Sequence, residues 1–169
     1  KKNLVGELNR GWYVGATLLD FERSGVDYPA EGQRMLEDLI DFAKNNTKNG
    51  IALSEDPLIK DKLANLAIEV EVCKLISYNV AWMQSQGLVP NKEASMAKIK
   101  GSELQQHLSE FGMMMMGMHG QLESGSKYAP LEGSILHQHL MNTSLTILAG
   151  TTEIQKGFIA TRGLGLPRG

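Results

Sequence analysis

The sequence predicts an all-α fold: an antiparallel, four-helix-type bundle with additional short helices. Three observations support this. Apolar residues recur every three or four positions over long stretches, and no stretch alternates as a strand would. The breaks between the stretches are short and rich in glycine, proline and asparagine. The 169 residues, 42% of them hydrophobic, suffice for one core, so we expect a single domain over residues 1–169.

The first expected helix runs from Leu4 to about Arg23. Its apolar positions share one side of a helix; they are Leu4, Leu8, Leu18 and Leu19, with Gly15 among them. Glycine and proline in residues 24–29 predict the end of this helix. A shorter helix is expected from about Met35 to Ala43, and the asparagines and glycine of residues 45–50 predict its end.

Asp56 followed by Pro57 is typical of a helix start, and the helix that begins there can run as far as Gln86, before Gly87. Residues at alternating spacings of three and four predict one continuous stripe toward partner helices. They are Leu63, Leu66, Val70, Cys73, Ser77 and Val80. The spacing identifies a bundle helix.

The same spacing continues after Pro90, and more regularly than in any other stretch. The positions are Ala94, Ala97, Gly101, Leu104, Leu108, Phe111 and Met115. Small residues at one end of this helix allow a close approach of its partner. We interpret the run Met113–Met116 as packing, because unbranched side chains fill irregular gaps.

A polar loop rich in glycine and serine is expected over residues 117–133. Leu136, Leu140 and Ile147 then fit another helix, which breaks at Ala149-Gly150. The last expected helix runs from about Thr151 to Arg162, and the glycines that follow predict its end.

Composition excludes several classes of protein. The net charge of −2 disfavours a nucleic-acid or membrane-surface binder. No apolar run approaches the roughly 20 residues that span a bilayer. The single cysteine, Cys73, lies in an apolar stripe and suits a reducing compartment, so we expect a cytoplasmic protein, or a mitochondrial-matrix protein in a eukaryote.

A helical bundle raises the possibility of a di-iron site, which would need paired Glu-x-x-His motifs on facing helices. The sequence contains no such motif. His137 and His139 are two residues apart and point to different sides of a helix, while His107 and His119 are isolated. We therefore expect no metal site.

Glu22 is a candidate base, because helical geometry places it within about 40° to 60° of the apolar stripe of the first helix. Partial burial there would raise the pKa of the carboxyl group until it could accept a proton near neutral pH. The alternative is structural: an ion pair with Arg23, or a cap at the helix end. Geometry alone somewhat favours this alternative.

The second candidate is the segment from Ala149 to Gln155, where a glycine turn delivers two threonine hydroxyl groups and free backbone N–H groups at a helix start. Such a start can bind anions or polar cofactor groups. Glycine followed by threonine is also a common helix entry.

At these residues the sequence resembles the acyl-CoA dehydrogenase family, whose final domain ends in a helix introduced by Gly-Thr-Ser/Thr-Glu/Gln-Ile-Gln and followed by Leu-Gly-Leu-Pro. Here residues 150–155 read Gly-Thr-Thr-Glu-Ile-Gln, and residues 164–167 read Leu-Gly-Leu-Pro. Residues 4–12, the Glu22-Arg23 pair and residues 93–98 are also similar to the family. The resemblance covers essentially the whole chain and identifies it as the family's C-terminal helical domain.

The resemblance implies a flavin enzyme that uses FAD and an acyl-CoA substrate. A glutamate removes the α-proton of the thioester, the flavin accepts a hydride from the β-carbon, and electrons pass to an electron-transfer flavoprotein. In many members the base directly precedes the Gly-Thr pair, where this chain has Ala149. Other members carry the base on the first helix of the domain, at the position of Glu22. By the same comparison, Gly150, Thr151 and Glu153 would bind the cofactor, and a dimer or tetramer is expected.

Two departures from the family keep alternatives open. An arginine that often binds the cofactor between the second and third helices is missing, although Lys48 could supply a charge there. The family's N-terminal helical domain and central β-domain are not in this chain, so the isolated domain is expected to be inactive. The alternatives are a non-catalytic assembly subunit of a hetero-oligomer and an oxidase relative that uses molecular oxygen.

Overall fold

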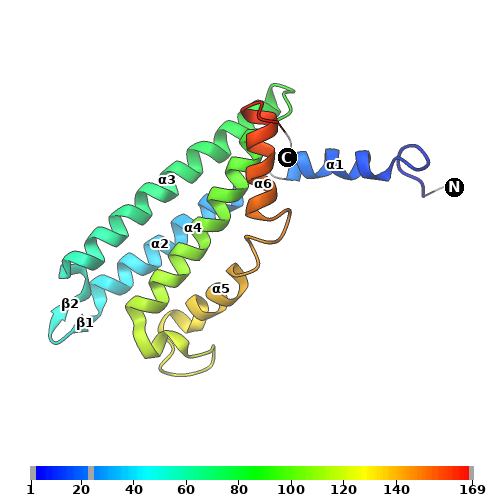
Figure 1. Cartoon of the computed structure of the whole chain (residues 1–169). Coiled ribbons are helices and arrows are strands. Elements are labelled where there is room, and N and C mark those ends of the chain that lie inside the picture. Colours follow the sequence, from blue (N-terminus) through cyan, green and yellow to red (C-terminus); the bar gives the residue numbers. More distant parts are fainter. Residues whose placement is uncertain (1–2, 23–24, 168–169) are drawn as a thin grey trace.

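The computed structural model describes residues 3–22 and 25–167, without the side chains of residues 17 and 19–22. Its helices confirm the all-α prediction. Three long helices lie side by side in Figure 1; they are α2 (Asp27–Asn45), α3 (Pro57–Ser85) and α4 (Lys92–Met116). The short helices α5 (Ser134–Asn142) and α6 (Thr152–Phe158) pack on α4. Within the described ranges, no helix is both long and apolar enough to cross a membrane.

The first helix is shorter than the sequence predicts, because α1 covers only Gly11–Glu22. Gly6 and Asn9 have positive φ angles of 76° and 63°, which a right-handed helix does not allow, so the preceding residues form turns. Leu4 and Leu8 therefore lie outside the helix, and both are exposed. The expected stripe from Leu4 to Leu19 was wrong in this part. α1 projects away from the bundle (Figure 1).

The second helix is longer than predicted, because α2 begins at Asp27. Pro29 lies in its first turn, where the missing N–H group costs no helical hydrogen bond. α2 ends before a hairpin of two short antiparallel strands, β1 (Thr47–Lys48) and β2 (Ile51–Ala52), which the sequence analysis did not predict. Asn49 and Gly50 form its turn with φ angles of 55° and 80°.

The two central helices begin and end close to where the sequence predicts. The Asp56 side chain caps α3 by accepting a hydrogen bond from the N–H of Leu58 at 2.8 Å. The predicted stripes of α3 and α4 form the core with α2 and α5; its buried members include Leu39, Leu66, Val70, Leu104, Leu108 and Ile135. Met113, Met115 and Met116 pack on this core, as predicted, whereas Met114 is exposed.

The segment after α4 differs from the prediction in one respect. α5 ends at Asn142, so the expected helix through Ile147 was too long. Thr143 and Ser144 turn their hydroxyl groups back to backbone carbonyls, and residues 143–149 form successive turns. α6 begins at Thr152, as expected, and continues into a π-helical turn over Ile159–Gly163.

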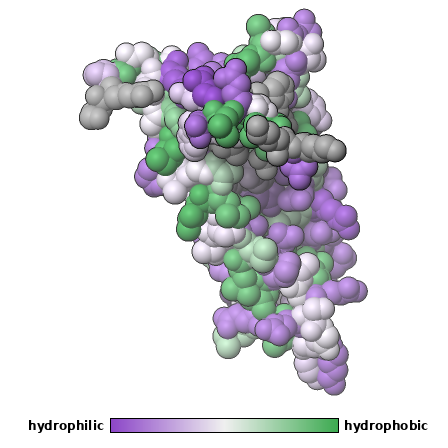
Figure 2. Space-filling model, turned by 90° about the vertical axis from the view of Figure 1, so that its right-hand side faces the viewer, coloured by the Kyte–Doolittle hydropathy of each residue, from purple (hydrophilic) through white to green (hydrophobic). Residues whose placement is uncertain are grey.

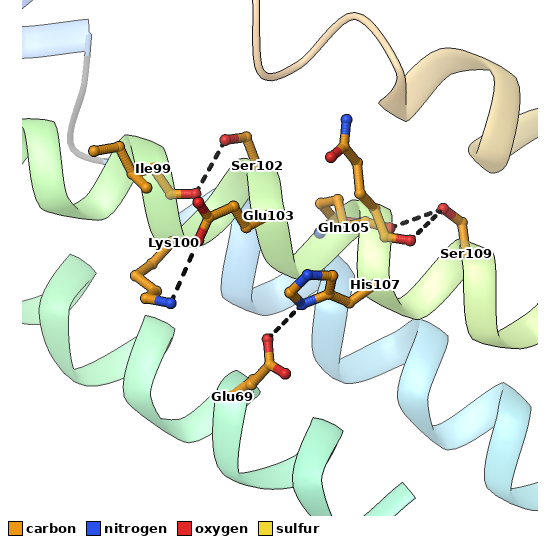
Figure 3. A network of polar contacts seen from close by, with 9 residues as sticks. Glu69, Ile99, Lys100, Ser102, Glu103, Gln105, His107 and Ser109 are labelled. Atoms are coloured by element: carbon orange, nitrogen blue, oxygen red, sulfur yellow. Dashed lines mark hydrogen bonds and ion pairs between the residues drawn. The ribbon is translucent and has the colours of Figure 1, made fainter. Parts of the chain in front are cut away.

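α4 carries a second buried stripe, and this one is polar. Its members follow the same three-four spacing; they are Ser95, Lys98, Ser102, Gln105 and Ser109. Figure 3 shows part of it: the Ser102 hydroxyl group donates to the Ile99 carbonyl, and the Ser109 hydroxyl group donates to Gln105. From α5, the Asn142 amide donates to the Gln105 carbonyl at 2.9 Å. Polar contacts therefore join α4 to α5 inside the bundle.

Candidate active site

The structure places Glu22 as the last residue of α1. Its side chain lies outside the described part of the molecule, as does all of Arg23, so the predicted burial of the carboxyl group and its possible ion pair stay predictions. Leu18, one turn earlier, is 67% exposed. Within this chain, therefore, the side of α1 that holds Leu18 is not covered.

The second candidate segment forms a tight turn followed by a capped helix. Ala149 and Gly150 both have positive φ angles, 55° and 91°. A Cβ atom on Gly150 would lie 2.7 Å from Nε2 of Gln155, which donates to the Ala149 carbonyl at 2.8 Å. Position 150 therefore requires glycine for both its backbone angle and its close packing.

Thr151 is the N-cap of α6, since its hydroxyl oxygen accepts a hydrogen bond from the N–H of Ile154 at 3.3 Å. The predicted helix entry at this threonine is thus confirmed. The carboxyl group of Glu153 lies beside it and is fully exposed. Its own backbone N–H, the Thr151 side chain and the charges of Lys156 and Lys98 lower the pKa of Glu153.

A lowered pKa makes Glu153 a poor proton acceptor near neutral pH, because its carboxylate holds protons weakly. The same carboxylate is a good hydrogen-bond acceptor for hydroxyl groups. Glu153 therefore suits the binding of a polar ligand better than it suits proton abstraction.

The fold packs the residues that follow the first candidate segment, and the helix of the second, on α4. Gly25, three residues after Glu22, is buried, and a Cβ atom there would lie 3.7 Å from Cβ of Ala97. The next residue on α4, Lys98, is 3% exposed and acts electrostatically on Glu153. The residues just before α2 and the helix α6, far apart in sequence, therefore both pack on α4.

Two buried side chains hold the connection between α1 and α2, and the sequence analysis assigned neither to the site. The Ser77 hydroxyl group of α3 donates to the Gly25 carbonyl at 3.0 Å. Nε2 of Gln105 on α4 donates to the Tyr28 carbonyl at 2.9 Å. The available signal was the presence of Ser77 in an otherwise apolar stripe, which indicates a buried hydrogen bond.

Other predicted residues are not part of this arrangement. Lys48 lies in the β1–β2 hairpin, at the opposite end of the bundle from α6 (Figure 1), so this chain does not bring its charge to Gly150. His107, which the sequence analysis described as isolated from other histidines, is hydrogen-bonded: its Nδ1 lies 2.8 Å from the Glu69 carboxylate of α3 (Figure 3). Among residues 3–22 and 25–167, no three acidic, histidine or cysteine residues cluster as metal ligands would.

Several apolar side chains are exposed between α5 and α6. Leu140 and Ile147 are each 64% exposed, and Met141, Leu148 and Ile154 are exposed as well. Figure 2 shows green, apolar patches among purple, hydrophilic ones on the face that it displays. Singly exposed apolar residues are common, but a series of them along one segment indicates a surface that another part of a protein covers.

A sequence model of a protein family, described as "Acyl-CoA dehydrogenase, C-terminal domain", matches residues 9–164. The chain is 34% identical to "Acyl-CoA dehydrogenase FadE26" of Mycobacterium tuberculosis, over 98% of this chain and 42% of that protein. It is 28% identical to "Caffeyl-CoA reductase-Etf complex subunit CarC" of Acetobacterium woodii, over 95% of this chain and 41% of that protein.

Among solved structures, the chain is similar to one in the ChsE4-ChsE5 complex from Mycobacterium tuberculosis. The TM-score is 0.87 and the identity 32%, over 98% of this chain and 43% of that one. The chain thus spans about two fifths of the length of these relatives.

Proposed function

Because the chain belongs to the acyl-CoA dehydrogenase family, with the C-terminal domain of that family matching nearly its whole length, we propose that it acts within a flavin-dependent acyl-CoA dehydrogenase. This enzyme introduces an α,β double bond into an acyl-CoA thioester by removing the α-proton and transferring a hydride from the β-carbon to FAD. The observation that carries the proposal is that the residues before α2 and the helix α6, far apart in sequence, both pack on α4. The N-terminal helical and central β-domains would supply the rest of the pocket.

Glu22 is the proposed base, and two observations about other positions support this choice. Ala149, directly before the Gly150-Thr151 pair, has no group that accepts a proton. Glu153 lies three residues after Gly150, but its lowered pKa keeps its carboxyl group anionic and makes it a weak base. Glu22 is the carboxylate at the end of α1, three residues before the buried Gly25.

The residues at the start of α6 fit a cofactor of the size and polarity of FAD. Gly150 allows the tight turn that packs against the Gln155 side chain, and Glu153 presents an exposed carboxylate to hydroxyl groups. Oε1 of Gln155 is buried and has no hydrogen-bond partner in the part of the chain that the structure describes. Gly150, Thr151 and Glu153 would therefore hold FAD, which, when bound, accepts the hydride from the β-carbon.

The proposed partners follow from the relatives and from the exposed surface. One similar protein is named as a subunit of an Etf complex, which supports an electron-transfer flavoprotein as the electron acceptor. Another belongs to the ChsE4-ChsE5 complex, which supports a dimer or tetramer and allows a hetero-oligomer. We place the enzyme in the cytoplasm, or in the mitochondrial matrix of a eukaryote, because the one cysteine among these 169 residues is a buried free thiol.

A second candidate is a non-catalytic assembly subunit of a hetero-oligomer. The observation that favours it is the position of Lys48, far from α6, together with the missing arginine in that hairpin. Trp12, 79% exposed on the projecting α1, suits a helix that packs on another subunit. This candidate predicts a subunit without bound flavin.

The test compares the full-length protein with its Glu22→Gln variant and with Glu7→Gln as the matched control. Glu7 is an exposed glutamate before the start of α1. Visible absorbance reports bound flavin, and bleaching by acyl-CoA reports turnover of the bound substrate. A yellow protein whose bleaching is lost only in Glu22→Gln supports the proposal. A colourless protein supports the assembly subunit, and normal bleaching in Glu22→Gln places the base elsewhere.

A further inference from the structure

The connection between α1 and α2 is bound to both central helices by hydrogen bonds from buried side chains. Gly25 is buried, with a φ angle of 64°, and its carbonyl accepts the 3.0 Å hydrogen bond from Ser77 on α3. Ser77 itself is 0% exposed. On the other side, the Tyr28 carbonyl accepts a hydrogen bond from Gln105 on α4. The start of α2 is therefore held from α3 and from α4.

Packing at this connection leaves no spare room. A Cβ atom on Gly25 would lie 3.3 Å from the Tyr28 ring and 3.7 Å from Ala97. A Cβ atom on Gly101 would overlap the Tyr28 ring. Tyr28 therefore fits closely against Gly101 of α4, with Gly25 beside its ring.

The large side chains of α1 that the structure describes are exposed. Trp12 is 79% exposed, Tyr13 59% and Leu18 67%. Figure 1 shows the helix extending outward from the bundle. Gly25 is the first residue after Glu22 that the structure describes, so its hydrogen bond with Ser77 is the nearest described contact that can set the position of Glu22 relative to the bundle.

We propose that Ser77 is a positioning residue for the reaction: its hydrogen bond to Gly25 sets where the end of α1, and with it the Glu22 carboxylate, stands against the substrate. This inference rests on the proposed role of Glu22 as the base. A base must stand within hydrogen-bond reach of the proton it removes. A displacement of about 1 Å can lower a rate by about 100-fold, even when its cause lies far from the reacting atoms.

The experiment uses the full-length enzyme with its flavin and compares Ser77→Ala with Ser102→Ala. Ser102 is the matched control, because it is equally buried but donates to Ile99 in its own helix. The probe is butyryl-CoA or palmitoyl-CoA, whichever bleaches the flavin. One readout is the incorporation of solvent deuterium at the α-carbon of the recovered acyl-CoA, which reports the removal and return of the α-proton. The other is amide hydrogen exchange of peptides that cover residues 22–30.

Ser77→Ala is expected to lower α-carbon exchange by at least about 10-fold, with flavin content and KM within about twofold of the parent. Amide exchange over residues 22–30 should rise in this variant and stay unchanged in Ser102→Ala. If Ser77→Ala does not fold, Gly25→Ala replaces it, because that change strains the same backbone and keeps the hydroxyl group. Equal α-carbon exchange in the Ser77 and Ser102 variants overturns the inference.

Glu22→Gln, measured in parallel, separates this inference from the proposed function. If α-carbon exchange is lost in Glu22→Gln but is unchanged in Ser77→Ala, the positioning role of Ser77 is overturned and Glu22 remains the base. Normal exchange in Glu22→Gln overturns the base assignment and the positioning role together.

Discussion

Gly101 on α4 is the position where an added methyl group should be most costly. In Gly101→Ala, the new Cβ atom would overlap Cγ and Cδ2 of the Tyr28 ring and lie 2.8 Å from its Cβ. These atoms are close to the Tyr28 backbone, so the ring cannot swing aside without moving the start of α2. The carbonyl of Tyr28 would move with it and weaken the 2.9 Å hydrogen bond from Gln105.

The expected magnitude combines three effects. Alanine in place of glycine inside a helix contributes about 1 kcal/mol of stabilisation. Overpacking costs about 1–3 kcal/mol, and the upper value applies because the overlap involves atoms near the backbone. The weakened hydrogen bond removes about 1 kcal/mol more. We expect Gly101→Ala to lower the free energy of unfolding by about 3 kcal/mol.

Alanine variants of two further glycines serve as controls for this measurement. At Gly32 the nearest atom to an added Cβ is the end of the Leu104 side chain, at 2.9 Å, which can rotate away, so packing and helix propensity should nearly cancel. At Gly157 in α6, nothing lies within 4 Å, and Gly157→Ala should stabilise slightly. Urea unfolding followed by far-ultraviolet circular dichroism gives the three free energies. If Gly101→Ala and Gly157→Ala unfold at the same urea concentration, the inference that Tyr28 packs tightly against Gly101 is refuted.

The remaining predictions concern two titrating groups. The backbone N–H of Glu153 and the Thr151 side chain lower the pKa of Glu153. The charged carboxylate therefore stabilises the folded state at pH values above the ordinary carboxyl pKa, and this stabilisation is lost as the pH falls through the lowered pKa. Thr151→Val should raise this pKa in a carboxyl NMR titration, whereas Thr152→Val should leave it; an equal rise in both would contradict the contact with Thr151. Burial raises the pKa of Cys73 to about 11, so its stabilising effect is full below the ordinary thiol range and lost as the pH rises toward that value. Only about a thousandth of this thiol is ionised at pH 8, and iodoacetamide should label it at least about 100-fold more slowly in the folded than in the urea-unfolded protein.

Local patterns predicted α3 and α4 well, because the spacing and the end signals of each helix lie within a few residues. Asp56-Pro57 marks the start of α3, and the glycine at position 117, with a φ angle of 57°, follows the end of α4. The start of α1 could not be read in this way, because the turn at Asn9 interrupts a sequence whose apolar spacing still fits a helix. The end of α5 depends on Asn142, whose side chain reaches a carbonyl on another helix.

In the candidate site, too, the sequence predicted the local features but not the contacts between distant parts of the chain. The glycine turn and the N-cap at Thr151 are local features, so the sequence predicted them and the structure confirms them. The hydrogen bond between Ser77 and Gly25 joins α3 to the residues just before α2, and no local pattern around either residue specifies its partner. The role of Glu22 stays a prediction, since it depends on atoms outside the described part of the chain.

The two stripes of α4 have a consequence for how the helix is oriented about its own axis. Each polar member directly follows an apolar or small one: Ser95 follows Ala94, Gln105 follows Leu104, and Ser109 follows Leu108. Adjacent residues are about 100° apart around a helix. If α4 turned about its axis by one residue, the amide of Gln105 would enter the apolar core and Leu104 would face the carbonyls that now bind amides. Each such exchange strands a buried polar group, so the paired stripes select one rotational setting of α4 and exclude its neighbours.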